Sequence, residues 1–235
     1  MKAILNRELK SYFNSPLVYI LYSIFLVISF IFFMIYNIMY GNSSLLNLCY
    51  NLNTIFVFLV PMITMRLFSE EKTQKTDQLL LTSPNTITSI VMGKFLSAFV
   101  IYSVMLSVTV LYAIIVACFT SFDIMSYMIL IIGELLLGAA FVSVGLFVSS
   151  ISQSIITSAL VSFGLLSVFY FAEMIPAIFG NPEILTKIFG FFSLSLRFNN
   201  FGIGLLAIDS IIYYLSIAAI FVFLTIRMID KKRWS

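Results

Sequence analysis

Six long apolar runs constrain the fold of this chain more than any other feature of its sequence. Each run is about 20 residues long, the length that a helix needs to cross a hydrocarbon core of roughly 30 Å. Helices satisfy their backbone hydrogen bonds internally, which lipid cannot do for them. The sequence therefore predicts an all-α integral membrane protein with six transmembrane helices, at approximately residues 17–40, 48–65, 95–119, 124–148, 155–179 and 211–228.

The composition agrees with lipid as the main solvent. Only 10% of the residues are charged, against about a quarter in soluble domains. The first run lacks the cleavage site of a signal peptide, so we expect it to be retained. Histidine is absent, which excludes histidine-dependent catalysis and metal ligation by histidine in this chain. The lysines and carboxylates form no evident catalytic pair, so we predict that the chain is not an enzyme and holds no metal.

The positions of Lys and Arg predict the topology. Of the 13 such residues, all but Lys187 and Arg197 fall on one side of the predicted spans. Cytoplasmic loops carry the excess of positive charge, so both termini are predicted to be cytoplasmic, in a multi-pass protein of the cell membrane. This topology and the anionic inner leaflet explain the net charge of +3, which gives no reason to expect a nucleic-acid partner.

Residues 1–16 form the first predicted unit, and residues 17–235 form the six-span unit. An apolar stripe in the first unit predicts an amphipathic helix that lies in the inner interface and ends at Asn14, Ser15 and Pro16. The alternative is an unstructured basic tail. The stripe consists of Ala3, Ile4, Leu5, Leu9, Tyr12 and Phe13.

The loop at residues 66–94 concentrates charge in an otherwise apolar chain. One helix is predicted from Ser69 to Leu81, with Glu70 and Glu71 in its first turn, where the helix dipole favours acids. Because this loop is predicted to lie in the cytoplasm, we expect it to contact another molecule there.

A second helix is predicted to start near Thr86, after the break at residues 82–85, and to continue into the third span. Residues 87–119 would form a helix about 50 Å long, so its first turns project below the membrane. Lys94 is expected to snorkel to the inner interface. Pro61 is expected to bend the second span before it enters the charged loop.

Residues 180–210, on the outer side, are too apolar for a free loop and too interrupted for a span. They are predicted to form short helices that dip into the outer leaflet, with Asp209 capping the sixth span. Cys49 and Cys118 fall near the outer ends of spans, and unpaired thiols are favoured over a disulfide.

Three carboxylates stand in or near membrane depth: Glu134, Glu173 and Asp209. Glu134 falls close to mid-bilayer, where a carboxylate is costly unless it is protonated or paired. It serves either a substrate pathway or a structural hydrogen bond, and the sequence favours neither. Glu173 lies nearer the outer end of its span, where a solvated or interfacial role is favoured. Gly93 and Lys94 do not form a phosphate loop, because the flanking positions lack its glycine and hydroxyl residues.

Three stretches carry a family resemblance that covers nearly the whole chain. They are Pro61 to Lys94, with Arg66, Glu70-Glu71-Lys72, Thr76 to Pro84 and Gly93-Lys94; Gly145 to Ser150; and Leu196 to Trp234, with Arg197, Asp209, Tyr213 and Tyr214. They resemble ABC-2 type permeases, the membrane subunits of ABC exporters. Within this family the chain is most similar to the branch of the gliding-motility permease and the permease of nitrous-oxide-reductase maturation.

The resemblance implies a subunit that pairs with a second permease, identical or different, and sits on separate ATP-binding subunits that hold ATP and Mg²⁺. The loop at 66–94 would then supply the coupling helix that docks on the ATPase. The implied coupling residues are Arg66, Glu70, Glu71, Lys72, Thr76, Leu79, Leu80, Leu81, Pro84, Gly93 and Lys94. Glu134 and Glu173 are candidates for the substrate pathway.

Two other functions compete with this one. A membrane scaffold would anchor an ATPase without moving a substrate, as the gliding-motility resemblance suggests. A passive channel is disfavoured because no span shows a regular polar stripe.

Overall fold

The computed structural model of the protein describes residues 1–76, 86–180 and 182–234. These residues form helices and contain no strand, so the all-α fold is confirmed. The elements are α1 (Lys2–Asn14), α2 (Pro16–Phe33), the π-helix η1 (Met34–Met39), α3 (Leu46–Thr64), α4 (Arg66–Thr73), α6 (Ile87–Leu106), α7 (Val108–Phe119), α8 (Ile124–Ile151), α9 (Ile155–Tyr170), the 3₁₀ helix η2 (Ala172–Met174), α10 (Ile175–Ile178), α11 (Glu183–Phe192), α12 (Leu194–Gly202) and α13 (Ile208–Trp234).

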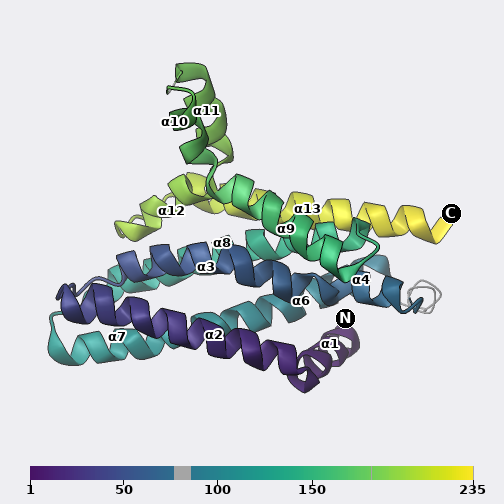
Figure 1. The fold of residues 1–235 in the computed structure, drawn as a ribbon, viewed down its shortest axis with the longest axis horizontal. Helices are drawn as coiled ribbons and strands as arrows, with labels where there is room; N and C mark the ends of the chain where they lie inside the picture. The colour runs from purple at the N-terminus through teal and green to yellow at the C-terminus, as the bar shows by residue number, and fades with distance from the viewer. Residues whose placement is uncertain (77–85, 181, 235) are drawn as a thin grey trace.

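Five helical segments in the described chain are long and apolar enough to cross a membrane, and a bent pair gives a sixth. The five are Pro16–Met39, Leu46–Thr73, Ile87–Phe119, Ile124–Ile151 and Ile208–Lys232. Successive segments run in opposite directions, and both termini lie at the same end of the bundle (Figure 1). We call this end, which carries α1 and α4, the terminal end.

The predicted span at 155–179 is bent in the structure, because α9 ends at Tyr170 and the chain turns by 57° into η2 and α10. Pro176 gives the physical reason for the break. Proline has no N–H to donate in a helix interior, but it fits in a first turn, and it occupies that place in α10.

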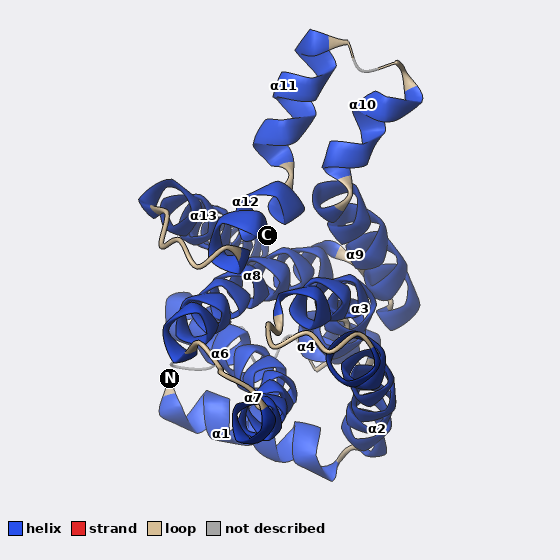
Figure 2. Ribbon diagram, turned by 90° about the vertical axis from the view of Figure 1, so that its left-hand side faces the viewer, coloured by secondary structure: helices blue, strands red, loops and turns tan. Residues whose placement is uncertain are grey.

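Helix α8 is the centre of the bundle and packs against α3, α4, α6, α9, α12 and α13 (Figure 2). Glycines on α8 allow two of these contacts to be very close. A Cβ atom at Gly138 would lie 2.1 Å from Cε1 of Tyr102, and one at Gly145 would lie 2.2 Å from Oγ1 of Thr64. These two positions therefore fix how near α6 and α3 come to α8.

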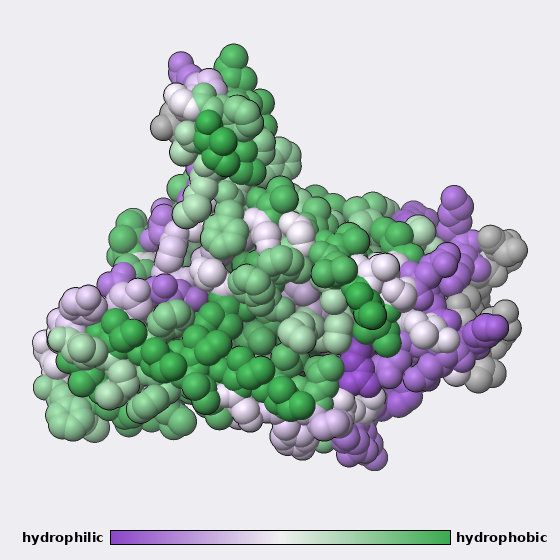
Figure 3. All heavy atoms as spheres, in the orientation of Figure 1, coloured by the Kyte–Doolittle hydropathy of each residue, from purple (hydrophilic) through white to green (hydrophobic). Residues whose placement is uncertain are grey.

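The surface is apolar along the length of the bundle and polar at the terminal end (Figure 3). Large apolar side chains are exposed on α2, α9 and α13, among them Ile20, Leu160 and Phe223. A surface of this kind requires lipid or protein rather than water around it. The fold is that of a multi-pass membrane protein.

The predicted helix from Ser69 to Leu81 begins three residues earlier than expected and is interrupted within its described part, while its predicted end at Leu81 lies outside the described residues. Helix α4 begins at Arg66 and ends at Thr73, so Glu70 and Glu71 lie in its middle and not in its first turn. The chain leaves the helix at Lys75, which has a φ of 57°. The predicted break at residues 82–85 lies outside the described residues.

The proline in the second span does not stop the helix at once. Pro61 lies inside α3, which ends at Thr64, and α4 follows after the single residue Met65. The amide of Met65 still donates to the carbonyl of Pro61 at 2.8 Å. The interruption therefore falls one turn after the proline.

The long third segment begins where the sequence predicts. The Thr86 side chain caps α6 by accepting from the amide of Ser89 at 3.3 Å. Helices α6 and α7 together run for 33 residues, about 50 Å, and are interrupted only at Ser107.

Between α9 and α13, short helices form as the sequence predicts. Helices α10 and α11 stand away from the bundle (Figures 1 and 2), and α11 has no buried residue. Asp209 lies inside the first turn of α13 and accepts from Arg197 at 2.8 Å, so it does not precede the helix as a cap. Cys49 is buried, Cys118 is exposed, and both are free thiols.

Candidate functional site

A buried lysine organises the terminal end of the bundle. The side chain of Lys94 on α6 is 1% exposed, and its Nζ lies 3.2 Å from Glu8 Oε1 and 3.0 Å from Glu71 Oε1. It also donates to the carbonyl oxygen of Leu67 at 2.5 Å. The prediction that Lys94 snorkels to the interface is therefore wrong, because α1 and α4 close over it and supply its anions.

Arg7, whose side chain is partly exposed, completes this group of charges. It contacts Glu8 Oε1 at 2.6 Å and Glu71 Oε1 at 2.9 Å. Partial burial opposes the charge of Arg7, but the hydrogen bonds and charges of Glu8 and Glu71 outweigh it and raise the pKa of Arg7. Two cations and two anions thus balance, and we call Arg7, Glu8, Glu71 and Lys94 the ion cluster.

A second ion pair holds the start of α4. Arg66 donates to both carboxylate oxygens of Glu70, at 2.8 Å and 3.0 Å, and to Ser15 Oγ at 2.6 Å. Ser15 is the residue between α1 and α2. A bidentate pair of this kind fixes orientation as well as distance, so the start of α4 is tied to the α1–α2 junction.

The opposite side of α4 is tied to the end of α8 by serines. Ser149 Oγ accepts from the amides of Phe68 at 3.0 Å and Ser69 at 3.3 Å, and it donates to the carbonyl of Met65 at 3.1 Å. Lys72 donates to the carbonyl oxygens of Ser150 and Ser152. A cation is favourable at a helix C-terminus, where carbonyl groups lack partners.

The structure brings together most of the described coupling residues that the sequence predicted. Arg66, Glu70, Glu71 and Lys72 lie on α4, and Lys94 lies beneath it. Gly93 is in close contact with α1, since a Cβ there would lie 2.9 Å from Cγ2 of Ile4. Thr76 follows α4 and donates from Oγ1 to the carbonyl of Glu71 at 3.3 Å. The remaining predicted residues, Leu79, Leu80, Leu81 and Pro84, lie outside the described residues.

The contacts of three residues were not predicted from the sequence: Arg7 and Ser149, which contact α4 directly, and Glu8, which contacts Lys94. The fourth predicted span ends at residue 148, whereas the structure extends α8 through Ile151 and so places Ser149 on the helix. The sequence signal that was available is the pair of opposite charges at positions 7 and 8 within an otherwise basic segment.

A separate polar group lies in the middle of the bundle. Glu134 on α8 is fully buried, and Tyr102 Oη donates to its carbonyl oxygen at 3.0 Å and to Oε2 at 3.3 Å. Among the residues that the structure describes, none forms a hydrogen bond with Oε1 of Glu134 or with the side-chain amide of Asn53, which is also fully buried. Glu173, by contrast, is half-buried in η2 and accepts from Tyr50 at 3.3 Å. The two candidate pathway residues are thus held by different partners.

Replacing Glu134 with glutamine separates the two roles that the sequence left open. We expect normal assembly and nearly normal transport, because Glu134 lies inside the protomer and a carboxamide oxygen still accepts from Tyr102. Transport by the reconstituted variant, with size-exclusion chromatography as the check on assembly, measures this. Loss of transport in a correctly assembled variant would instead place Glu134 on the pathway.

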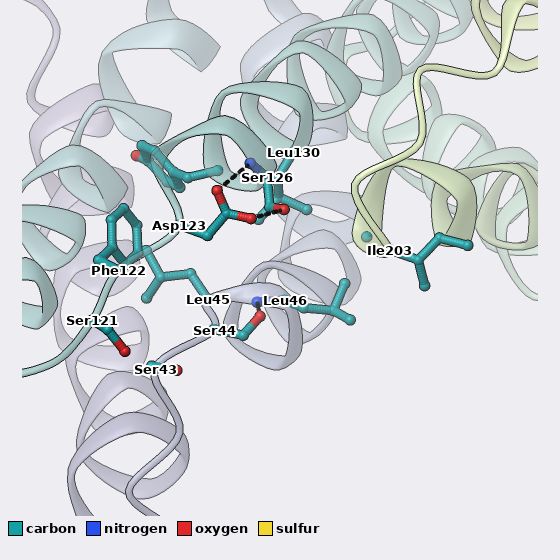
Figure 4. Close-up of a pocket in the computed structure, with 12 residues that line it drawn as sticks. Ser43, Ser44, Leu45, Leu46, Ser121, Phe122, Asp123, Ser126, Leu130 and Ile203 are labelled. Carbon is teal, nitrogen blue, oxygen red and sulfur yellow. Dashed lines mark hydrogen bonds between the residues drawn. The ribbon is translucent and has the colours of Figure 1, made fainter.

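A cavity of about 250 Å³ lies beside the starts of α3 and α8 and the end of α12 (Figure 4), at the end of the bundle opposite the terminal end (Figure 1). Ser44, Phe122, Asp123 and Ser126 are among the residues that line it. Asp123 caps α8 by accepting from the amide of Met125 at 3.0 Å and from Ser126 Oγ at 2.5 Å. Hydrogen bonds from Ser126 lower the pKa of Asp123. None of these residues was predicted as part of a site, although Asp before a long apolar run is a helix-cap signal.

Residues that could bind a metal do not gather anywhere in the described parts of the chain. No group of three His, Cys, Asp or Glu side chains there is placed to hold an ion. The arrangement at α4 consists of ion pairs and helix-end hydrogen bonds, which position this segment.

Comparison with known proteins identifies the family. A search of curated proteins finds no match to the chain. A model of the family described as "ABC-2 family transporter protein" matches residues 3–229. Because the match covers nearly the whole chain, and because the fold is a bundle of apolar helices, the chain belongs to the ABC-2 transporter family of membrane transport components.

Proposed function

We propose that this protein is the permease subunit of an ATP-driven exporter in the cell membrane, with both termini in the cytoplasm. A separate subunit binds ATP and Mg²⁺, and segment 66–94 docks on it. The membership of this chain in the ABC-2 transporter family supports the transport role. The observation that carries the docking role is the anchoring of α4, which ion pairs and serine hydrogen bonds tie to α1, α6 and α8.

This anchoring gives the segment a mechanical function. A force applied by the ATPase to the segment after α4 reaches Glu71, and from there Lys94 on α6 and Glu8 on α1. The same force reaches the end of α8 through Ser149. ATP-driven motion of the loop would thereby move three helices of the bundle together, because these contacts are short and largely buried.

We propose that two copies of the permease form the working unit and that the substrate passes between them. The exposed apolar faces of α2, α9 and α13 offer surfaces for such a contact. Glu134 and Asn53 lie inside a single protomer, so neither would line a path between copies without a rearrangement.

The docking role is tested by introducing a charge into the apolar group Leu79 to Leu81. We expect Leu80→Asp to abolish co-purification of the ATPase and ATP-dependent transport, while the permease still inserts in the membrane. An apolar knob that fills a groove on a partner is an interaction centre, where one buried charge costs at least tenfold in affinity. Pull-down of the ATPase and flux into inverted vesicles are the measurements.

Gln153→Asp is the matched control, since Gln153 is exposed in the turn after α8 and the substitution adds one negative charge at the same end of the bundle. It should leave ATPase binding unchanged. Unchanged ATPase binding and transport in Leu80→Asp would contradict the docking role. ATPase binding without flux of any substrate in the unsubstituted complex would favour the scaffold function.

A further inference from the structure

Helix α1 presents to its surroundings a face whose charges are all positive. Lys2, Asn6 and Lys10 are exposed and spaced four residues apart, so they lie along one side of the helix. Phe13, which is 46% exposed, continues the same side. We call Lys2, Asn6, Lys10 and Phe13 the basic face. The opposite side, with Ile4 and Tyr12, is buried against the bundle.

The only acid of α1 is removed from this face by the ion cluster. The carboxylate of Glu8 points inward to Lys94 Nζ, and its side chain is 13% exposed. Arg7, which is 54% exposed, adds a further cation at the edge of the helix. The pairing of Glu8 therefore leaves α1 with an outward charge that no acid on the same helix neutralises.

The position of α1 in the bundle indicates which kind of partner the basic face contacts. Helix α1 lies at the terminal end, beside the edge of the apolar surface that covers the bundle (Figures 1 and 3). A helix that presents lysines and an aromatic ring at such a boundary has the composition of a segment that lies on anionic lipid. Charge complementarity thus favours lipid headgroups over an apolar protein surface.

We propose that the basic face of α1 binds anionic lipid headgroups and that the ion cluster transmits this contact to α4. Headgroup binding holds α1 at the membrane surface. Glu8 then holds Lys94, and Lys94 holds Glu71 on α4, through contacts of 3.2 Å and 3.0 Å. The transmission rests on the proposed coupling function, whereas the lipid contact does not.

Brominated lipids test the contact directly. The chain has a single tryptophan, Trp234, so Phe13→Trp in a Trp234→Phe background places one fluorophore on the basic face. The full-length protein is reconstituted with brominated phosphatidylglycerol or brominated phosphatidylcholine. We expect stronger quenching by the anionic lipid, and high salt should weaken the preference because the charges are exposed.

Removing the lysines should remove this preference. Each lysine near a charged surface contributes about a five-fold factor, so Lys2→Gln with Lys10→Gln should lower the preference about 25-fold. Lys187→Gln is the matched control, because Lys187 is also exposed but lies on α11. Equal quenching by both lipids, or an equal loss in the Lys187→Gln control, would overturn the lipid contact.

The transmission is read from the ATPase rate of the assembled complex in vesicles with and without phosphatidylglycerol. We expect the rate to depend on the anionic lipid, and we expect Glu8→Gln to remove this dependence while the quenching preference persists. If the ATPase rate were the same with and without phosphatidylglycerol, despite a clear quenching preference, the proposed transmission from α1 to α4 would be refuted. Failure of the proposed coupling function is recognised separately, because the ATPase then does not bind the permease, while the quenching experiment still gives a result.

Discussion

Replacing Lys94 with methionine should lower the free energy of unfolding by about 3 kcal/mol, because it leaves the carboxylates of Glu8 and Glu71 without their buried cation. For a chain of this size the unfolding temperature should fall by roughly 6–12 °C. Methionine preserves most of the volume of the lysine stem, so the loss reports the charge rather than a cavity. Thermal unfolding of the purified protein in detergent measures it.

The chain offers a matched control in the pair of Lys187 and Glu183. Their charged atoms are 2.7 Å apart, but the side chains are 75% and 83% exposed. An exposed pair contributes less than about 1 kcal/mol, so Lys187→Met should leave the unfolding temperature nearly unchanged.

A second substitution tests whether the ion cluster acts as a unit. Adding Glu71→Gln to Lys94→Met removes one of the two uncompensated carboxylates, so the double variant should be more stable than the sum of the single losses predicts. Additive losses would show that the ion cluster does not act as a unit, and a Lys94→Met variant as stable as the control would show that it does not stabilise the fold.

The transmembrane helices were predictable because their signal is local. Length and hydropathy of each run decide whether it can span lipid, and neither depends on distant residues. The cap at Thr86 is local too, since it involves only the first turn of α6. The bend after Tyr170 had a local cause in Pro176, but the apolar composition of residues 155–179 hid it.

The candidate site was only half predictable, because its contacts join distant parts of the chain. Lys94 and Glu8 are 86 residues apart, and Ser149 lies 81 residues from Phe68. Nothing in the sequence near Lys94 shows that α1 folds back over it. A lysine near the end of a span was therefore expected to snorkel, whereas the tertiary fold supplies two carboxylates and buries it.

The end of α4 likewise could not be predicted from the local sequence. Residues 69–81 contain good helix formers, yet the helix stops at Thr73 and Lys75 takes a positive φ. Lys72 donates to two carbonyl groups at the end of α8, which fixes the last turn of α4 there. Tertiary contacts thus override helix propensity at this point.

Replacing Gly138 with alanine should destabilise the bundle by about 3 kcal/mol, because the added methyl group has no space. A Cβ at this position would lie 2.1 Å from Cε1 and 2.4 Å from Cζ of Tyr102. The ring cannot move aside easily, since it is fully buried, packs against Phe56 at 4.6 Å between centroids and donates a hydrogen bond to Glu134. The substitution should therefore also break the contact that joins α6 to α8.

Gly164→Ala on α9 is the control for this prediction, since a Cβ there meets nothing within 4 Å. Alanine is also the better helix former, so this variant should be as stable as the unsubstituted protein or slightly more stable. Unfolding temperatures of the two variants, measured in the same detergent, decide the matter. If Gly138→Ala were as stable as Gly164→Ala, Tyr102 would have to leave its place between α6 and α8. The buried position of Glu134 as a hydrogen-bonded structural residue would then have no support.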